Sequence, residues 1–421
     1  MSAQLFAGYV MSINKPFFSV VMPTYNRAAL LPFAIQSVLQ QSFTDFELII
    51  SNGGSTDNTK DVVAGFKDER IRYFESEKRL SIGDNYQNAL DQAKGEYITF
   101  LSDDDAFAPV MLERVKRIID EQSAEVVAFQ VSYYYHDPVF EHYRKIQPNT
   151  LFAYPFSGLV KKYEASEAIK LFDSKLGLNG APPDRKFIMP YLANAVYHHS
   201  VFSRIKEIRN KLFNVIPADM YLAIAVFFVI DTYFCLDEPL HVWSFWEGNA
   251  TGSLSKKGDK LREHYERLLN GQKLEFTPLK FALPLNCTIN AILQAKNDFK
   301  GFNNNSDIDW LYYFTAIYKD LMFLKSLGVN TAKEIQEFEE VLARQPDELR
   351  QNVRSKISKT NLFADQAMQF SRNNFPFVFR WLKRLHEQVK SEKSVIAHGK
   401  DANFNNVLEA AQYLSYIVQG K

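Results

Sequence analysis

The stretch Tyr97-Ile-Thr-Phe-Leu-Ser-Asp-Asp-Asp105 decides how the rest of the chain is interpreted. Its first five residues are apolar or strand-forming, and they lead directly into Ser102 and three successive carboxylates. The apolar spacing of the next segment, which begins Phe107-Ala-Pro109, predicts a helix with Pro109 in its first turn. The acids are therefore predicted to lie at the carboxyl end of a buried strand, where open α/β sheets bind ligands.

Three adjacent carboxylates repel one another, so folding them together costs free energy unless positive charge lies among them. A divalent cation that also holds a phosphate meets this need, because Mg²⁺ and Mn²⁺ take oxygen ligands from one or two carboxylates and from substrate phosphates. The alternative is that Asp104 or Asp105 caps the following helix, since aspartate is a favoured N-cap residue. Capping uses only one of the three acids, and we therefore favour a metal and phosphate site.

The composition is that of an ordinary globular protein. The chain has 421 residues, of which 46% are hydrophobic and 23% charged, and this length allows two or three domains. The formal net charge is zero, so bulk electrostatics do not indicate a nucleic acid partner. The two cysteines, Cys235 and Cys287, lack metal-ligand spacing and are typical of a reducing compartment. Residues 221–230 form an apolar run about half as long as a membrane span, and residues 1–10 lack a secretory pattern, so we expect a cytoplasmic protein.

Strand and helix patterns alternate five times between Phe18 and Val131. The first four strands are predicted at 18–22, 46–50, 71–74 and 97–101. This alternation predicts an α/β fold with a mostly parallel sheet, flanked by helices and joined by right-handed crossovers. The loops after the first, second and fourth strands then meet at one crevice. Neither the glycine pattern of a dinucleotide site nor that of a P-loop is present.

Several motifs follow one another in a characteristic order. They are Ser19-Val-Val-Met-Pro-Thr-Tyr-Asn-Arg27, residues 34–43, residues 46–59, residues 85–98 and Ser102-Asp-Asp-Asp105. Together they resemble the family 2 glycosyltransferases of the GT-A fold, strongly over residues 17–131 and more weakly to about residue 255. The resemblance implies a Rossmann-like, nucleotide-binding GT-A domain at 16–255, preceded by a leader at 1–15. Its donor-binding half would be 16–131 and its acceptor-side half 132–255.

The resemblance also implies a nucleotide-sugar donor and a divalent cation, Mn²⁺ or Mg²⁺. The residues that it assigns to the nucleotide sugar are Pro23, Thr24, Tyr25, Arg27, Asn52, Gly53, Asn85, Ser102 and Asp103. It assigns the metal to Asp104 and Asp105, and His241 is either a further ligand or an ordinary loop histidine. Many members carry an acid pair that reads uracil where this chain has Asn52-Gly53, so we expect UDP while dTDP, GDP and CDP stay open.

Asp219 heads an apolar helix, two residues after Pro217. Aspartate in this place is commonly an N-cap, and the resemblance makes it the catalytic base; both can hold. Inverting sugar transfer needs a carboxylate to deprotonate the acceptor hydroxyl as it attacks from the face opposite the leaving diphosphate. We therefore expect an inverting, metal-dependent transfer to a hydroxyl of a glycan or glycolipid in surface polysaccharide assembly.

The remaining sequence is less specific. Residues 194–208 are predicted to be helical and residues 232–236 to form a strand. From residue 256 the apolar spacing predicts a mainly α-helical C-terminal domain, 256–421, with helices at 261–269, 310–324, 335–342, 375–389 and 407–417. Its role stays open between packing, homo-oligomer formation, acceptor binding and contact with the inner face of a membrane. The aromatic and basic stretch 375–385 is either an interfacial helix or a buried helix with a solvated basic edge.

Two alternative functions remain open at this point. A nucleotidyltransferase would also place acids at a strand end, although it usually needs a basic, glycine-rich phosphate loop that residues 23–27 do not provide. A catalytically inactive nucleotide-sugar-binding module would keep the fold, and the Asn52-Gly53 pair is compatible with it.

Overall fold

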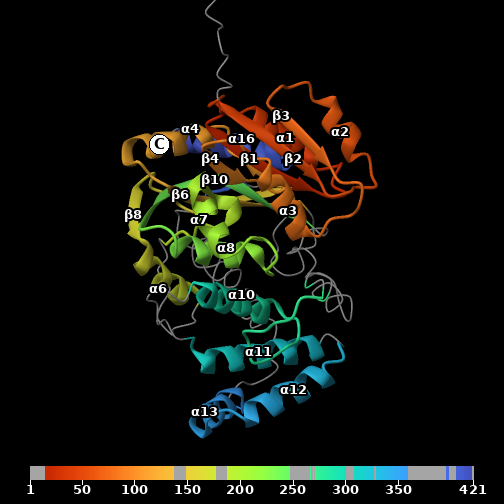
Figure 1. The fold of residues 1–421 in the computed structure, drawn as a ribbon, viewed down its shortest axis with the longest axis vertical. Coiled ribbons are helices and arrows are strands. Elements are labelled where there is room, and N and C mark those ends of the chain that lie inside the picture. The colour runs from red at the N-terminus through yellow and green to blue at the C-terminus, as the bar shows by residue number, and fades with distance from the viewer. Residues whose placement is uncertain are drawn as a thin grey trace, which may run out of the picture.

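The computed structural model describes residues 15–136, 148–176, 187–246, 266, 269, 271–299, 308–326, 329–358, 395–397 and 404–419. Within these residues a mixed sheet carries helices on both faces, and a stack of helices continues beneath one of those faces (Figure 1). The predicted fold class, an α/β sheet with a helical C-terminal part, is therefore confirmed. The domain boundary at residue 256 stays a prediction.

The donor-binding half alternates strands and helices as its sequence predicts. Its elements are β1 (Phe18–Thr24), α1 (Leu31–Leu39), β2 (Phe46–Asn52), α2 (Thr59–Gly65), β3 (Ile71–Glu75), α3 (Ile82–Asp91), β4 (Tyr97–Phe100), β5 (Ala106–Phe107), α4 (Met111–Gln122) and β6 (Val126–Tyr135). Every residue of β1, β2 and β4 is buried. Near-continuous apolar strands of this kind are typical of parallel strands that are covered on both faces.

The sheet is parallel at one side and mixed at the other. Its main order is β11-β7-β6-β9-β4-β1-β2-β3, and the four strands from β3 to β4 run parallel. The later strands are β7 (Thr150–Ala153), β8 (Val160–Glu164), β9 (Ala195–His198), β10 (Thr232–Phe245) and β11 (Val395–Ala397). β10 runs parallel to β6 and antiparallel to both β5 and β8. The four-stranded parallel part therefore brings the loops after β1, β2 and β4 to one edge.

Two short strands replace predicted helical residues. Ala106–Phe107 is β5, which pairs with His241 and Val242 of β10, so α4 begins at Met111 and Pro109 precedes it. Residues 195–198 form β9, which is inserted antiparallel between β4 and β6, and only the residues from His199 onward are helical. In both places pairing with distant strands overrides the local apolar spacing.

Helices cover both faces of the sheet. α1, α2 and α4 share one apolar core with one face, and the opposite core contains side chains of α3, α6 (Ala165–Leu176), α7 (His199–Ile208) and α8 (Ala218–Phe227). α8 is buried along most of its length, as expected for a helix between two layers. Its position fixes where Asp219, in its first turn, can lie.

A stack of helices lies beneath α8 (Figure 1). It consists of α10 (Pro284–Asp298), α11 (Trp310–Ser326), α12 (Ala332–Ala343) and α13 (Asp347–Ser358). Asp298 joins the first layer to α8, because its carboxylate accepts hydrogen bonds from Arg209 and Tyr221, each at 2.8 Å. The predicted helix at 375–389 and most of that at 261–269 lie outside the described residues.

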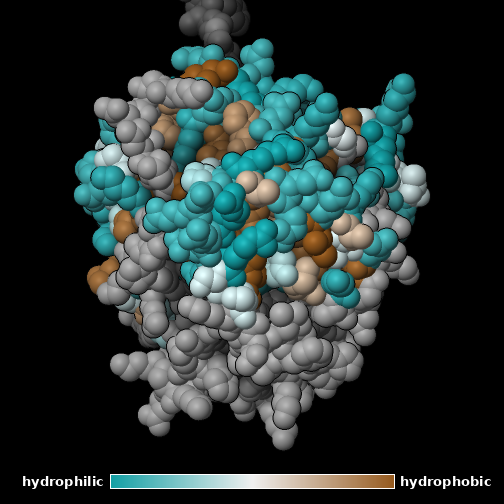
Figure 2. All heavy atoms as spheres, turned by 90° about the horizontal axis from the view of Figure 1, so that it is seen from below, coloured by the Kyte–Doolittle hydropathy of each residue, from teal (hydrophilic) through white to brown (hydrophobic). Residues whose placement is uncertain are grey.

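Among the described residues seen from below, polar side chains surround several apolar patches (Figure 2). Among the described residues, no helix is both long and apolar enough to cross a membrane. The predicted membrane contact and oligomer formation stay predictions.

The last described helix, α16 (Val407–Gln419), returns to the sheet. Its buried residues Val407, Ala411 and Leu414 share a core cluster with Val242 of β10 and Ala106 of β5. α16 therefore packs against β5, which follows the acid turn, and against β10.

We predict that Leu414→Ala lowers the free energy of unfolding by about 2–5 kcal/mol, because it leaves a cavity in this cluster. Leu414 is fully buried, whereas Tyr416 on the same helix is 77% exposed. Tyr416→Ala is the matched control and should change stability by less than about 0.5 kcal/mol. Urea unfolding of both variants measures the difference, and equal losses would contradict the packing described for α16.

Candidate active site

The three acids lie in a tight turn between β4 and β5. The backbone N–H of Asp105 donates to the carbonyl of Ser102 at 3.2 Å and closes the turn. Asp104 and Asp105 are 8% and 7% exposed, and the side chain of Asp103 is 13% exposed. The acids are at the carboxyl end of β4, as predicted, but the turn that carries them leads into a strand rather than a helix. Capping of a helix by Asp104 or Asp105 is therefore excluded.

Asp105 is held by the backbone and side chains of β10. Its Oδ1 accepts a hydrogen bond from the backbone N–H of Ser244 at 2.8 Å, and its Oδ2 lies 3.2 Å from Nε2 of His241. His241 is fully buried, and its Nδ1 contacts the backbone carbonyl of Ala193. Both ring nitrogens of His241 thus face protein atoms. Its role as a metal ligand stays a prediction, and the observed contact is support for Asp105.

Asp103 and Asp104 contact a different pair of residues. The indole N–H of Trp246 donates to Oδ2 of Asp104 at 2.9 Å. The guanidinium of Arg27 lies 4.6 Å from the centre of the Trp246 ring, and its Nε is 3.7 Å from Oδ1 of Asp103. A cation over an indole face is attracted by the negative charge of the ring. One arginine and one tryptophan therefore stabilise two of the three acids.

Burial dominates the electrostatics of the turn. It raises the pKa of Asp103 to about 6, against the opposing effects of Arg27 and the Tyr25 backbone. Burial and the charges of Asp105 and Asp103 raise the pKa of Asp104 further, to about 8. Like charges at close range favour retention of a proton, and a bound cation would remove that preference.

Asp219 lies on the other side of the sheet edge, in the first turn of α8. Pro217 occupies the N-cap position, and Oδ1 of Asp219 accepts from the backbone N–H of Met220 at 2.9 Å, so Asp219 is not the N-cap. Its side chain is exposed, yet the surrounding protein reduces its solvation, which raises the pKa of the carboxyl. A carboxylate with a raised pKa is better suited to accept a proton.

Tyr86 of α3 links Asp219 to the acid turn. Burial raises the pKa of its hydroxyl, and the charges of Asp103, Asp105 and Asp219 raise it further. One buried hydroxyl therefore experiences the field of both groups of acids. Tyr86 is absent from the residues predicted from the sequence, and its only signal there is its position one residue after Asn85 on a helix that faces the site.

The predicted donor-binding residues at the ends of β1 and β2 are close together. Thr24 pairs with Asn52 in the parallel ladder. Asn85 connects three elements, since its Nδ2 donates to the carbonyl of Thr24 at 3.0 Å and its Oδ1 accepts from the hydroxyl of Ser51 at 2.7 Å. A Cβ at Gly53 would approach Nδ2 of Asn85 to 2.9 Å. Gly53 and Asn85 therefore fix the shape of this edge, and their contact with a ligand stays a prediction.

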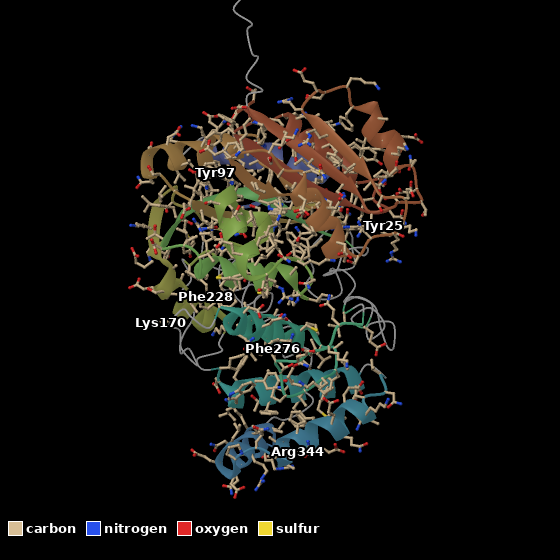
Figure 3. The ribbon with its side chains drawn as sticks, viewed as in Figure 1. Tyr25, Tyr97, Lys170, Phe228, Phe276 and Arg344 are labelled. Carbon is tan, nitrogen blue, oxygen red and sulfur yellow. The ribbon has the colours of Figure 1, made fainter. Side chains whose placement is uncertain are left out.

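Asn52 and Tyr25 occupy the outer part of the same edge. Oδ1 of Asn52 accepts from the backbone N–H of Ser55, and its Nδ2 donates to the hydroxyl of Tyr73, both at 2.8 Å. The Asn52 amide thus organises its own loop. The guanidinium of Arg79 lies over the Tyr25 ring, 4.9 Å from its centre. Arg79 is not among the site residues predicted from the sequence. Tyr25 lies beyond the carboxyl end of β1, whereas Tyr97 marks the opposite end of the parallel sheet (Figure 3).

The side chains present at the acid turn suit a hard cation but do not form a complete cage. Among the described residues, no group of three or more histidine, cysteine, aspartate or glutamate side chains could hold a metal ion by itself. Asp104 suits a cation that is held partly by substrate phosphates. Its carboxylate is buried, burial and the neighbouring acids raise its pKa, and its Oδ1 makes no hydrogen bond with the described residues. Mg²⁺ is commonly held by one or two carboxylates together with substrate phosphates and water.

Taken together, the fold and the site define an α/β protein with three acids at a strand end and a further carboxylate in the first turn of α8. Residues 19–175 match the family model "Glycosyl transferase family 2". The chain is therefore similar to that family over these residues.

The chain spans little more than a third of the first relative that it matches, and more of some others. A GalNAc(5)-diNAcBac-PP-undecaprenol beta-1,3-glucosyltransferase of Campylobacter jejuni is 41% identical over 114 residues, which cover 26% of this chain and 37% of the relative. An uncharacterized glycosyltransferase of Mycoplasma pneumoniae is 28% identical over 255 residues, 59% of this chain and 74% of that protein. The solved structure of S. aureus TarS residues 1–349 with UDP-GlcNAc shares 16% identity and a TM-score of 0.45, over 84% of this chain and 90% of that one.

We predict that Asp104→Asn removes part of the pH dependence of stability. The pKa of Asp104 rises from 3.8 to about 8 on folding, so the native state retains a proton that the unfolded state releases, and stability falls as pH rises from about 4 to about 8. At pH 8.5 the variant should be more stable than the wild type, by on the order of 1.4 kcal/mol for each pKa unit of the rise.

Urea unfolding at intervals between pH 5 and pH 8.5 measures this effect. Asp231→Asn is the control, because that carboxylate is exposed and distant from the turn. An Asp104→Asn profile that is parallel to the wild-type profile would show that repulsion in the turn does not limit stability.

Proposed function

We propose that the protein is a glycosyltransferase that moves a sugar from a nucleotide diphosphate donor to an acceptor hydroxyl. The observation that carries this proposal is the cluster of three nearly buried acids at the carboxyl end of β4, beside Arg27, whose Nε lies 3.7 Å from Asp103. Asp219, in the first turn of α8, is the further carboxylate of the proposal. That arrangement suits a reaction in which one group of acids handles a diphosphate and another carboxylate takes a proton.

The transfer proceeds with inversion at the anomeric carbon in this proposal. Asp219 accepts the proton of the acceptor hydroxyl while the oxygen of that hydroxyl attacks C1 of the sugar. The bond between C1 and the diphosphate oxygen breaks on the opposite face, and the diphosphate leaves with the electron pair. The raised pKa of Asp219 makes its carboxylate a better proton acceptor.

A divalent cation, Mn²⁺ or Mg²⁺, belongs to the same proposal. Asp104 would hold it, and when bound the cation supplies positive charge that stabilises the departing diphosphate. Asp103 and Arg27 would then lie beside the diphosphate and ribose, and Tyr25 beside the base. The buried acids in the turn support this assignment, because their mutual repulsion would be relieved by a cation.

The proposal also names the nucleotide, the acceptor and the place of the reaction. We propose UDP as the nucleotide and a glycan or lipid-linked glycan as the acceptor, in surface polysaccharide assembly. The name of the Campylobacter relative includes an undecaprenol-linked acceptor. Cys235 and Cys287 are both buried and are not joined in a disulfide, which suits the reducing cytoplasm. The reaction would then take place at the inner face of a membrane.

We expect one nucleoside diphosphate to raise the melting temperature in a Mn²⁺-dependent manner. A ligand that binds only the native state at 100 times its Kd stabilises it by about 2.7 kcal/mol, which corresponds to a shift of a few degrees. UDP, GDP, dTDP and CDP are compared, each with and without Mn²⁺, and UDP should give the largest shift. Pyrophosphate release from a nucleoside triphosphate would favour a nucleotidyltransferase, and no response to any nucleotide would overturn the donor site.

We expect Asp219→Asn to keep the Mn²⁺-dependent thermal shift and to lower the transfer rate at least about 100-fold, the usual contribution of a general base. Nucleotide release from the UDP-sugar in the presence of acceptor measures the rate. Asp231→Asn, an exposed acid just beyond the other end of α8, is the matched control and should retain full activity. An unimpaired Asp219→Asn enzyme would remove the residue from the mechanism.

A further inference from the structure

The end of β10 holds the acid turn in place. β10 is fourteen residues long. Ser244, near its end, contacts Asp105, and Trp246, the residue after β10, contacts Asp104. Both oxygens of Asp105 face β10, one at the backbone N–H of Ser244 and the other at His241. Only one oxygen of Asp104 is engaged in a comparable way, by the indole of Trp246. The two neighbouring acids are therefore held differently.

Trp246 is itself fixed between two charged groups. Its N–H points to Oδ2 of Asp104 at 2.9 Å, and the guanidinium of Arg27 lies 4.6 Å from the centre of its ring. Arg27 also forms an ion pair with Asp103 at 3.7 Å. An indole can only donate a hydrogen bond through its nitrogen, and it carries no lone pair that could bind a metal ion. Contact with Trp246 therefore orients Asp104 without adding a ligand or a charge.

We propose that Trp246 is the positioning residue of the cation site: it holds Oδ2 of Asp104 so that Oδ1 faces the cation and the diphosphate. This inference rests on the proposed function, since it concerns the cation that the glycosyltransferase would use. A carboxylate that binds a metal ion is generally hydrogen-bonded by a second layer of donors, whose loss lowers metal affinity about 10- to 100-fold. Trp246 is such a donor, and the guanidinium of Arg27 over its ring holds the indole in this orientation.

The contact between Trp246 and Asp104 has a second possible effect on cation affinity, of opposite sign. If the cation needed Oδ2, the indole N–H would compete with it, and removal of Trp246 would tighten cation binding. The two arrangements predict changes of opposite sign. A direct measurement of cation affinity therefore separates them without reference to catalytic activity.

The test is a titration of the full-length protein with Mn²⁺ in the presence of UDP, monitored by the electron paramagnetic resonance signal of free Mn²⁺. Trp246→Phe retains an aromatic ring under Arg27 and loses only the donor, so the Kd for Mn²⁺ should rise at least about 10-fold. Trp243→Phe, on the same strand, is the control and should bind as the wild type does.

A second readout uses the fluorescence of Trp246. Mn²⁺ is a paramagnetic quencher, so its binding at Asp104 should quench part of the tryptophan emission at the same concentrations that saturate the resonance titration. That part of the quenching should be absent in Trp246→Phe and present in Trp243→Phe. The melting temperatures of all variants without Mn²⁺ show whether each one is folded.

The outcomes separate this inference from the proposed function. Equal or tighter Mn²⁺ binding by folded Trp246→Phe overturns the positioning role and leaves the metal-dependent transferase intact. Absence of Mn²⁺ binding in the wild type and every variant overturns the metal dependence and the positioning role together. Weaker binding by folded Trp246→Phe, with wild-type binding by Trp243→Phe, supports the positioning role.

Discussion

The burial of three like charges at the end of β4 is the constraint on which the site depends. Asp103, Asp104 and Asp105 are nearly covered by protein, and burial together with mutual repulsion raises the pKa of Asp103 and Asp104. Such a turn folds only if the surrounding elements supply donors and positive charge. β10 supplies the donors, and the turn after β1 supplies Arg27. The pairing of strands in the sheet brings these three segments together and so forms the site.

The helical layers fix the position of Asp219. Asp219 lies in the first turn of α8, a helix that is buried between the sheet and α10. Asp298 of α10 binds both Arg209 and Tyr221, and thereby fixes the start of α8 relative to the layer below. The stack that begins with α10 thus has a mechanical connection to the proposed base, although it contributes no acid to the crevice among the described residues.

Local sequence pattern predicted most of the donor-binding half, and it failed where distant strands decide the conformation. The apolar runs of β1, β2 and β4 and the helical spacing of α1, α3 and α4 were sufficient to place these elements. Phe107 stood at the start of a segment predicted to be helical and residues 195–198 within a predicted helix, yet both pair with strands far away in the chain. A short segment with an ambiguous pattern takes the conformation that its neighbours in space stabilise, and the neighbours are invisible to a local pattern.

The sequence by itself determined the alternating α/β arrangement, the position of the acids at a strand end and the likeness to family 2 glycosyltransferases, because each depends on residues close together in the chain. Only the tertiary structure decided which groups hold each acid. Trp246 follows Asp104 by 142 residues, and Ser244 follows Asp105 by 139. Their contacts arise because β10 lies parallel to β6 and folds back on β5. Strand pairing over such distances is set by the packing of the whole sheet, and no spacing within the sequence encodes it directly.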